Sequence, residues 1–345
     1  MTRRRTRRTP RPRGAALLMA MMTVTLVATL AAAALWRQWR GIEVESAERT
    51  RVQSAWLLTG ALDWARVLLQ GDLREDMLHP PPVDHLGEPW AVPLAESRLS
   101  DFLSAGDSGA SDLERNAFLS GQVTDLQSRL NVLDLAASGQ QTQADALARF
   151  TRLFQALGLS ASPLAALQRN LICAYTAMYP GQSGSACNVS DAPILPQRVE
   201  QLTWLGLDAA TVARLSPYVT VLPLLGPGSI TPVNLNTASS VVIYAALPGL
   251  ETAQAECMTA QRQTGYFKSV QDAAKCANGM DLTGSPWIAV NTSFFEVRGR
   301  LRLDDAALQE VSVVQRNANT PATRMGVFPL WRARSALTQP APGGP

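Results

Sequence analysis

The fold is decided by the stretch Gly14–Trp36, which reads GAALLMAMMTVTLVATLAAAALW. From Ala15 onward this stretch carries no charged side chain until Arg37. At a helical rise of about 1.5 Å per residue, about 22 such residues span about 30 Å, which is the thickness of the hydrocarbon core of a bilayer. The stretch is therefore predicted to form a helix that crosses a membrane.

Charges on the two sides of this stretch predict its orientation. Residues 2–13 read TRRRTRRTPRPR, whereas the acidic residues Glu43, Glu45 and Glu48 follow the apolar stretch. Because basic flanks stay on the cytoplasmic side of a membrane, the N-terminus is predicted to be cytoplasmic and the rest of the chain to lie outside. A secretory signal that is cleaved near the alanine run 31–34 is the alternative.

The helical pattern continues beyond the apolar stretch. Apolar residues recur every three or four positions at Ala55, Leu58, Leu62, Ala65 and Leu69. This spacing places them on one face of a helix. We therefore expect one long helix from about Ala15 to Leu69, apolar on all sides at first and amphipathic afterwards.

Length and composition leave room for two domains in addition to the anchor. The chain has 345 residues, of which 46% are hydrophobic. Its formal charge of +3 is misleading, because seven arginines lie within the first fourteen residues and the remainder has 24 basic against 28 acidic side chains, a net of −4. Bulk charge therefore gives no support to a nucleic-acid partner.

The four cysteines form two pairs that are close in sequence, Cys173 with Cys187 and Cys257 with Cys276. Behind an export signal these pairs favour two disulfides, whereas four reduced thiols would be the alternative in a cytosolic protein. The sequence has no CxxC motif and no histidine near these cysteines. A zinc site built on sulfur is therefore not predicted.

The remaining pattern predicts an α/β domain that is interrupted by helices. Residues 118–132 alternate and turn like a pair of short strands, and alternation returns in three late strands at 293–303, 308–316 and 325–334. Helical spacing dominates between these regions, within 144–215 and 238–276. The simplest topology is one sheet domain with a helical insertion.

A helix-hairpin-helix element is predicted inside this insertion. Asn236 or Thr237 would cap its first helix, residues 248–249 would form the hairpin, and residues 255–263 the second helix. Some such elements bind DNA phosphates through the hairpin. The segment 230–289 has a net charge of −1, because it contains Arg262, Lys268 and Lys275 against Glu251, Glu256, Asp272 and Asp281. Structural packing is favoured, and a membrane-tethered DNA-binding module is the alternative.

A loop near residue 107 offers two weaker interpretations. Residues 106–109 read GDSG, as in the nucleophile loop of trypsin-like proteases. The histidines, His79 and His85, lie in a proline-rich tract that does not resemble the setting of a catalytic base, so a hydrolase acting through this loop is not favoured. Weak calcium candidates are Asp107, Asp112 and Glu114, although solvated acids are the simpler interpretation.

The N-terminal signal resembles that of a known superfamily. A short basic leader that ends in glycine, followed by a long apolar helix that merges into an amphipathic one, resembles the signal of type IV pilins and of the pseudopilins of type II secretion. The resemblance implies that a prepilin peptidase cleaves after Gly14 and that Ala15 is then N-methylated. Most members carry glutamate at the fifth mature position, where this chain has Met19.

The order of several further motifs resembles the minor pseudopilin K family. These motifs are DHLGEPWAVP at 84–93, SGQVTDLQSRLNVLDL at 120–135, LSPYVTVLP at 215–223, VNLNTASSVVIYAAL at 233–247 and VNTSFFEVRGR at 290–300. Relatives tend to carry an acidic segment near 172–190, where this chain reads ICAYTAMYPGQSGSACNVSD. Some relatives have calcium sites. Because this chain lacks the acidic segment, those sites are expected to be absent or altered here.

The resemblance implies an α+β fold in which a long N-terminal helix packs on a small antiparallel sheet that is interrupted by a large all-α insertion. The expected parts are the leader 1–14, the transmembrane half-helix 15–36, the first part of the pilin-like domain 37–135, the insertion 136–289, the returning strands 290–335 and a tail 336–345.

The resemblance also implies a function without catalysis. The expected protein is an inner-membrane component of a type II secretion system, with its bulk in the periplasm, that caps a pseudopilus tip and initiates or limits its assembly. Expected partners are the minor pseudopilins I and J, the pseudopilus, the assembly platform and the prepilin peptidase, with nucleic acid not expected. No cofactor is required, and calcium is an optional ligand.

Overall fold

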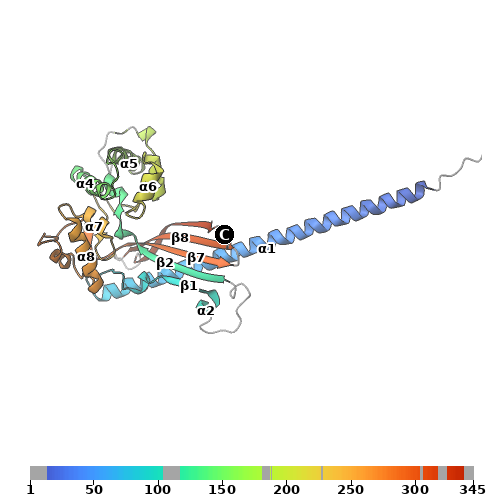
Figure 1. Cartoon of the computed structure of the whole chain (residues 1–345), viewed down its shortest axis with the longest axis horizontal. Coiled ribbons are helices and arrows are strands. Elements are labelled where there is room, and N and C mark those ends of the chain that lie inside the picture. Colours follow the sequence, from blue (N-terminus) through green and yellow to red (C-terminus); the bar gives the residue numbers. More distant parts are fainter. Residues whose placement is uncertain are drawn as a thin grey trace, which may run out of the picture. The chain divides into compact units, whose positions relative to one another are not determined.

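The computed structural model describes residues 14–103, 117–180, 187, 189–226, 228–303, 306–317 and 325–337. The chain divides into two compact units, Met1–Leu57 and Leu58–Pro345. The first unit consists, in its described part, of the N-terminal portion of helix α1, which runs from Ala15 to Leu78. The second unit contains the end of α1, a sheet and a group of shorter helices (Figure 1).

The part of α1 in the first unit has the character of a membrane span. It contains an 18-residue window with a mean hydropathy of 2.1, none of which is buried in the protein. The hydroxyls of Thr23, Thr25 and Thr29 donate hydrogen bonds to backbone carbonyls three residues earlier in the helix. The polar groups of these side chains are thereby satisfied inside the helix, as a lipid environment requires.

The end of the helix differs from the sequence prediction, which placed it at Leu69. The helix continues to Leu78 because the buried stripe continues through Leu73, which is 3% exposed. It stops before Pro80 and Pro81, which are incompatible with a helix interior.

A five-stranded antiparallel sheet forms the pilin-like part of the second unit, in the order β1-β2-β7-β8-β9. The strands are β1 (Leu94–Arg98), β2 (Ala117–Asp125), β7 (Phe294–Leu303), β8 (Ala306–Asn317) and β9 (Gly326–Leu337). The three late strands and the α+β fold class are confirmed. The chain returns to the sheet after the insertion because β7 pairs with β2 along its whole length, from Ala117 with Leu303 to Asp125 with Phe295.

The pair of short strands predicted within residues 118–132 is present as β2, a 3-10 turn and the two-residue strand β3 (Leu130–Asn131), although β2 is longer than expected and the two strands belong to different sheets. The partner of β2 on the outer side is β1, which begins directly after Pro93. Strand β2 ends at Asp125, whose carboxylate accepts a hydrogen bond from the backbone N–H of Gln127 and starts a tight 3-10 turn. A side chain that captures a backbone donor two residues ahead competes with strand pairing.

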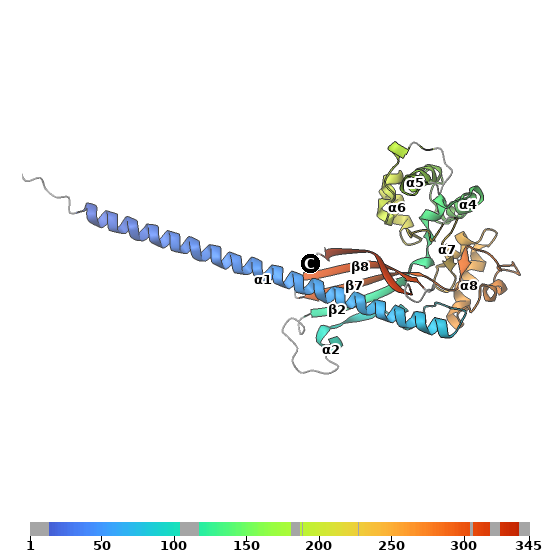
Figure 2. The same cartoon turned by 180° about the vertical axis from the view of Figure 1, so that it is seen from behind.

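The C-terminal part of α1 covers one face of this sheet (Figure 2). Leu62, Ala65 and Leu69 of the helix are buried against Phe295, Val297, Val314 and Val327 of the strands. Gly299 lies where the helix approaches most closely, because a Cβ atom at this position would be 3.0 Å from Cδ1 of Leu58.

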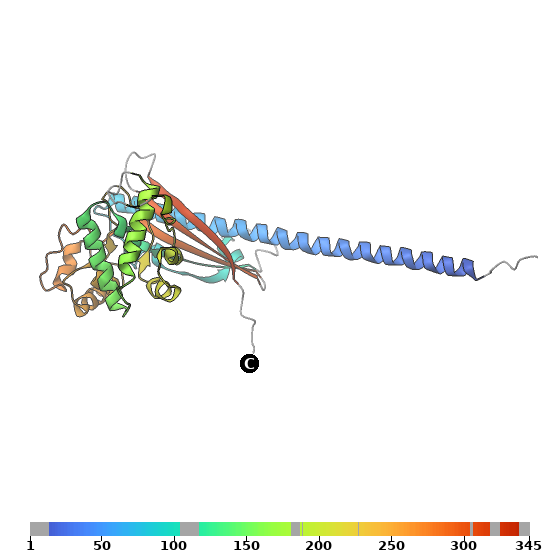
Figure 3. The same ribbon diagram turned by 90° about the horizontal axis from the view of Figure 1, so that it is seen from above.

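The insertion is helical (Figure 3). It has its own large core. Its α-helices are α4 (Gln140–Ala156), α5 (Leu164–Met178), α6 (Ala209–Leu215), α7 (Ser240–Ala246) and α8 (Thr252–Thr264). Two short parallel ladders join β3 (Leu130–Asn131) to β4 (Val219–Thr220) and β5 (Val233–Asn234) to β6 (Ile288–Ala289). The domain limits given from the sequence stay predictions.

Short elements complete the described chain. They are α2 (Leu99–Leu103) and the 3-10 turns Pro89–Ala91, Leu126–Ser128, Val132–Ala136, Val189–Asp191, Val199–Leu205 and Val270–Lys275.

The close approach of α1 to Gly299 gives a stability prediction. Gly299→Val is expected to lower the free energy of unfolding by about 1–3 kcal/mol, because the new side chain must push Leu58 out of a buried position. Urea unfolding of the full chain in detergent micelles measures this loss. Leu58→Ala opens the same space, so the double variant should lose less than the sum of the two single losses. Simple additivity would contradict the proposed contact.

Candidate functional site: the polar junction between sheet and insertion

Polar residues from four of the quoted motifs meet where the insertion leaves and rejoins the sheet. Asp125, at the end of β2, is fully desolvated, and its carboxylate accepts hydrogen bonds from the N–H of Gln127 at 2.7 Å, the Asn234 amide at 3.0 Å and the Thr237 hydroxyl at 2.5 Å. A buried carboxylate is costly unless its oxygens are satisfied. These bonds therefore tie the end of β2 to β5 and to the start of the helix-hairpin-helix element.

The two asparagines of this element hold backbone segments that are distant in sequence. Asn234 also donates to the carbonyl of Asp84 at 3.1 Å. Asn236 donates to the carbonyl of Phe267 at 2.9 Å and accepts from the N–H of the same residue at 2.8 Å. Because the side chains of Asn236 and Thr237 are engaged here, neither caps α7 as predicted. Ser239 caps this helix instead.

A second link crosses the entry and the exit of the insertion. The side chain of Gln127 donates to the carbonyl of Pro232 at 2.9 Å and accepts from the N–H of Ser293 at 2.7 Å. Asn131 likewise donates to the carbonyl of Leu222 and accepts from its N–H, both at 2.9 Å. Both side chains are buried. Each therefore forms hydrogen bonds with one backbone carbonyl and one backbone N–H that would otherwise be unsatisfied.

The centre of the junction is a buried arginine. Arg316 of β8 is 4% exposed, and its guanidinium binds both carboxylate oxygens of Asp84 at 2.5 Å and the carbonyl of Thr292 at 2.9 Å. It also pairs with Asp72 and, at 3.4 Å, with Asp76, both near the end of α1. One guanidinium thus fastens α1, the segment after it, and β8 to one another.

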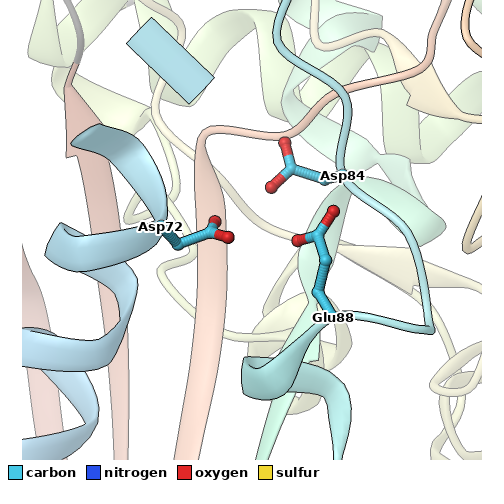
Figure 4. Close-up of side chains that lie close together, drawn as sticks. All are labelled: Asp72, Asp84 and Glu88. Carbon is cyan, nitrogen blue, oxygen red and sulfur yellow. The ribbon is translucent and has the colours of Figure 1, made fainter. Parts of the chain in front are cut away.

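The surplus of carboxylates around this arginine shifts their pKa values. Burial raises the pKa of Glu88 to about 8, and the negative charges of Asp72 and Asp84 add to the shift. Burial also raises the pKa of Asp84 to about 7, although the charge of Arg316 opposes this. Figure 4 shows Asp72, Asp84 and Glu88 with their carboxylates turned toward one another. With this pKa Glu88 is mostly protonated at neutral pH, and its carboxyl oxygens accept hydrogen bonds from the backbone N–H of His85 and the indole N–H of Trp90.

By residue type this cluster is the best candidate for a metal site in the described part of the chain. One oxygen from each of Asp72, Asp84 and Glu88 lies within 4.8 Å of the others, and hard cations bind such oxygens. However, Arg316 already supplies a positive charge to Asp72 and Asp84, and both oxygens of Glu88 already accept hydrogen bonds from His85 and Trp90. The cluster therefore serves as a structural ion pair.

The structure joins the cysteines in the two pairs that the sequence favours. Cys173 is bonded to Cys187 and Cys257 to Cys276, with Cα atoms 5.7 and 5.6 Å apart. The first disulfide joins Cys173, within α5, to Cys187, and the second joins α8 to the residue that follows the 3-10 turn Val270–Lys275.

The other predicted site residues do not gather in one place. Gly14 precedes α1, and Ala15 and Met19 lie in its first turns, where Met19 is exposed. Their roles in cleavage and methylation stay predictions. The GDSG loop and the calcium candidates Asp107, Asp112 and Glu114 lie outside the described residues.

The histidines and the hairpin are engaged in packing contacts. His85 stacks on Tyr266 with ring centroids 3.9 Å apart, and His79 lies beside Glu75. Arg262, a basic residue near the hairpin, donates to the carbonyls of Leu235 and Ala238. A guanidinium that is held by backbone carbonyls is not presented to DNA phosphates, which agrees with the packing interpretation.

Sequence reasoning missed Arg316 and its partners on α1. A signal was present, since Asp72 and Asp76 continue the buried stripe of Leu62, Leu69 and Leu73 at helical spacing. Two acids on a buried stripe require a buried cation elsewhere in the chain.

The first prediction for this junction concerns its arginine. Arg316→Gln is expected to lower the free energy of unfolding by about 3–5 kcal/mol, because Asp84 then remains buried without its partner. Urea unfolding followed by tryptophan fluorescence measures this. The exposed pair between Arg49 and Glu45 provides the control, since Arg49→Gln should change stability by at most about 0.5 kcal/mol. Adding Asp84→Asn to Arg316→Gln should recover part of the loss, and a further full loss would refute the pairing.

The second prediction concerns pH. Between about pH 4.5 and pH 8 the folded chain keeps the proton of Glu88 while the unfolded chain releases it, so this group makes stability fall as pH rises through that window. Glu88→Gln removes the titration, so its stability should fall less than that of the parent chain between about pH 5.5 and about pH 8. Glu48→Gln, at an exposed helix position, is the matched control. Parallel pH curves for Glu88→Gln and the parent would show that Glu88 is already ionised.

Comparison with known proteins agrees with this architecture. Sequence models of one family, type II secretion system protein K, match residues 128–224 and 233–292. The type II secretion system protein K of Pseudomonas aeruginosa is 28% identical over 344 residues, covering 96% of this chain and 96% of that protein. The protein of the same description from Klebsiella pneumoniae is also 28% identical, covering 90% of this chain and 94% of that protein.

A solved structure shows the same fold. It is the GspK-GspI-GspJ complex from the type 2 secretion system of enterotoxigenic Escherichia coli, one chain of which matches with a TM-score of 0.57 and 14% identity, covering 84% of this chain and 98% of that chain. Of the motif residues that build the junction, Asn131 and Asn234 to Thr237 lie inside the matched segments, whereas Asp125 and Gln127 lie just before the first of them. Together these comparisons support the identification of the chain as a minor pseudopilin that is similar to type II secretion system protein K.

Proposed function

We propose that the chain caps the tip of a pseudopilus and initiates or limits its assembly. The observation that carries the proposal is the helical insertion, which leaves the sheet after Asp125 and returns before Phe294, at the end of the sheet where α1 finishes. A further subunit added at this end would meet the insertion instead of a free pilin-like surface. A subunit of this form suits the last position of a filament and not an internal one.

The residue at the start of α1 supports the same position. If cleavage follows Gly14, the fifth mature residue is Met19, which is apolar. A carboxylate in a membrane is stable only with a partner, and Met19 offers none to the N-terminus of a neighbouring subunit. The chain therefore lacks the contact that resemblance to other pilins assigns to subunits inside a filament.

We further propose the partners and the topology. The similar E. coli chain is part of a complex named for GspK, GspI and GspJ. By analogy, the partners of this chain are the minor pseudopilins I and J, followed by the pseudopilus and the inner-membrane assembly platform. The basic leader favours a cytoplasmic N-terminus that a prepilin peptidase processes, with the body in the periplasm. The role is structural and requires no cofactor, and calcium binding stays a prediction.

The proposal predicts where the chain lies on a filament. In cells that overproduce pseudopili, antibodies against the insertion should label one end of each filament, because only the last position accommodates this subunit. Electron microscopy with gold-labelled antibody measures the positions of the label. Antibodies against the major subunit should label the whole length in the same preparation. Label from the insertion antibody along the filament shaft would refute capping.

A further inference from the structure

The face of the sheet that is turned away from α1 carries a row of arginines. Successive side chains of a strand point to opposite faces. Val297, Gly299 and Leu301 of β7 are buried on the side of α1, so the alternate residues Arg298, Arg300 and Arg302 emerge on the other face. The first two are exposed and Arg302 is half-buried.

Neighbouring strands place polar groups beside this row. Arg300 is paired in register with Ser120 of β2 and Gln309 of β8, and Arg298 is paired with Gln122 of β2. These side chains line a shallow depression of about 200 Å³ on the face of the sheet. Its lining is rich in hydrogen-bond donors, so it suits a polar, anionic ligand.

The charges on this face are only partly neutralised by the chain itself. Arg298 pairs with Glu296 at 2.7 Å, and Arg302 pairs with Glu96 of β1 at 2.5 Å. Arg300 makes no ion pair or hydrogen bond with any residue that the structure describes, and the same holds for Arg98 of β1.

The resulting patch stands out against the rest of the protein. Four arginines against two glutamates leave the face with a net charge of +2, whereas residues 15–345 together carry 24 basic and 28 acidic side chains. A local positive field on an otherwise acidic body directs acidic partners to this place.

The spacing of the row restricts the ligand further. Residues two apart on a strand are separated by about 7 Å, so the guanidinium groups of residues 298, 300 and 302 form a ladder with this repeat. An extended peptide that carries carboxylates on every second residue has the same repeat on one of its faces. Arginine forks bind carboxylates with defined geometry, so matching the two repeats allows several pairs to form together.

We propose that this face, built on Arg298 and Arg300, is a docking surface for an extended acidic segment of a protein partner, with carboxylates at alternate positions. The surface lies on the side of the sheet that α1 does not cover, so it is distinct from the helix and from the insertion that support the tip position. It gives the subunit a means to hold a second protein, and its test does not depend on where the subunit lies on a filament.

The test uses the full chain in detergent micelles and a fluorescent peptide of alternating glutamate and serine. Fluorescence anisotropy measures the affinity at several salt concentrations. The alternating peptide should bind about tenfold more tightly than the same peptide with glutamine in place of glutamate, and its affinity should fall as salt rises. The double variant Arg298→Gln with Arg300→Gln should lose this affinity by about tenfold.

Matched controls make the result specific. The variant Arg74→Gln with Arg169→Gln removes the same charge from exposed positions on α1 and α5, and should bind the peptide as the parent does. An equal loss in this control would overturn the proposal, as would equal binding of a peptide with all its glutamates in one block. Vesicles of phosphatidylcholine with one third phosphatidylglycerol test the alternative, and vesicle binding that needs Arg298 and Arg300 without peptide binding would assign the face to lipid headgroups.

Discussion

The bond between Arg316 and Asp84 is the constraint on which the rest of the body depends. Asp84 has no exposed surface, and its backbone and side chain bind Val290 and Thr292 at the exit from the insertion. Arg316 adds α1 through Asp72. Asn234 then extends the same network to Asp125 at the entry. A pilin-like sheet and a separate helical core are thus joined by satisfied buried polar groups, whose loss costs more than that of apolar contacts of similar size.

Several carboxylates surround this single arginine, and protonation of Glu88 reduces the excess negative charge. Because desolvation raises the pKa values of Asp84 and Glu88, the folded junction avoids the full repulsion of its acids. A buried ion pair rarely stabilises a protein more than apolar packing of the same volume would. It does restrict the elements that carry the charges to one relative arrangement. The junction therefore fixes the angle between the sheet and the insertion.

The sequence predicted the helices and strands of this protein better than the contacts that join them. Local periodicity was sufficient for the helix around Leu58–Leu69 and for the late strands, because alternation and helical spacing are visible within a dozen residues. It did not predict β1, whose five residues follow a proline tract, or the length of β2, whose end is set by the side chain of Asp125. The pairing of Asp84 with Arg316 could not be predicted from local sequence, because the two residues are 232 positions apart and neither is unusual in its local sequence. Only the acids on the buried stripe of α1 gave a local signal that a buried cation was needed.

The position of the insertion explains how one chain can combine a polymer-forming fold with a bulky domain. Asp125 at the end of β2 lies opposite Phe295 near the start of β7, so the chain leaves and re-enters the sheet at adjacent points on paired strands. An insertion between such points leaves the register of β2 and β7 intact, whatever its size, because its ends are already close. The sheet keeps the form that packs on α1, and the insertion occupies the end of the sheet. A pilin-like fold can therefore gain a bulky helical domain without losing the sheet that packs on α1.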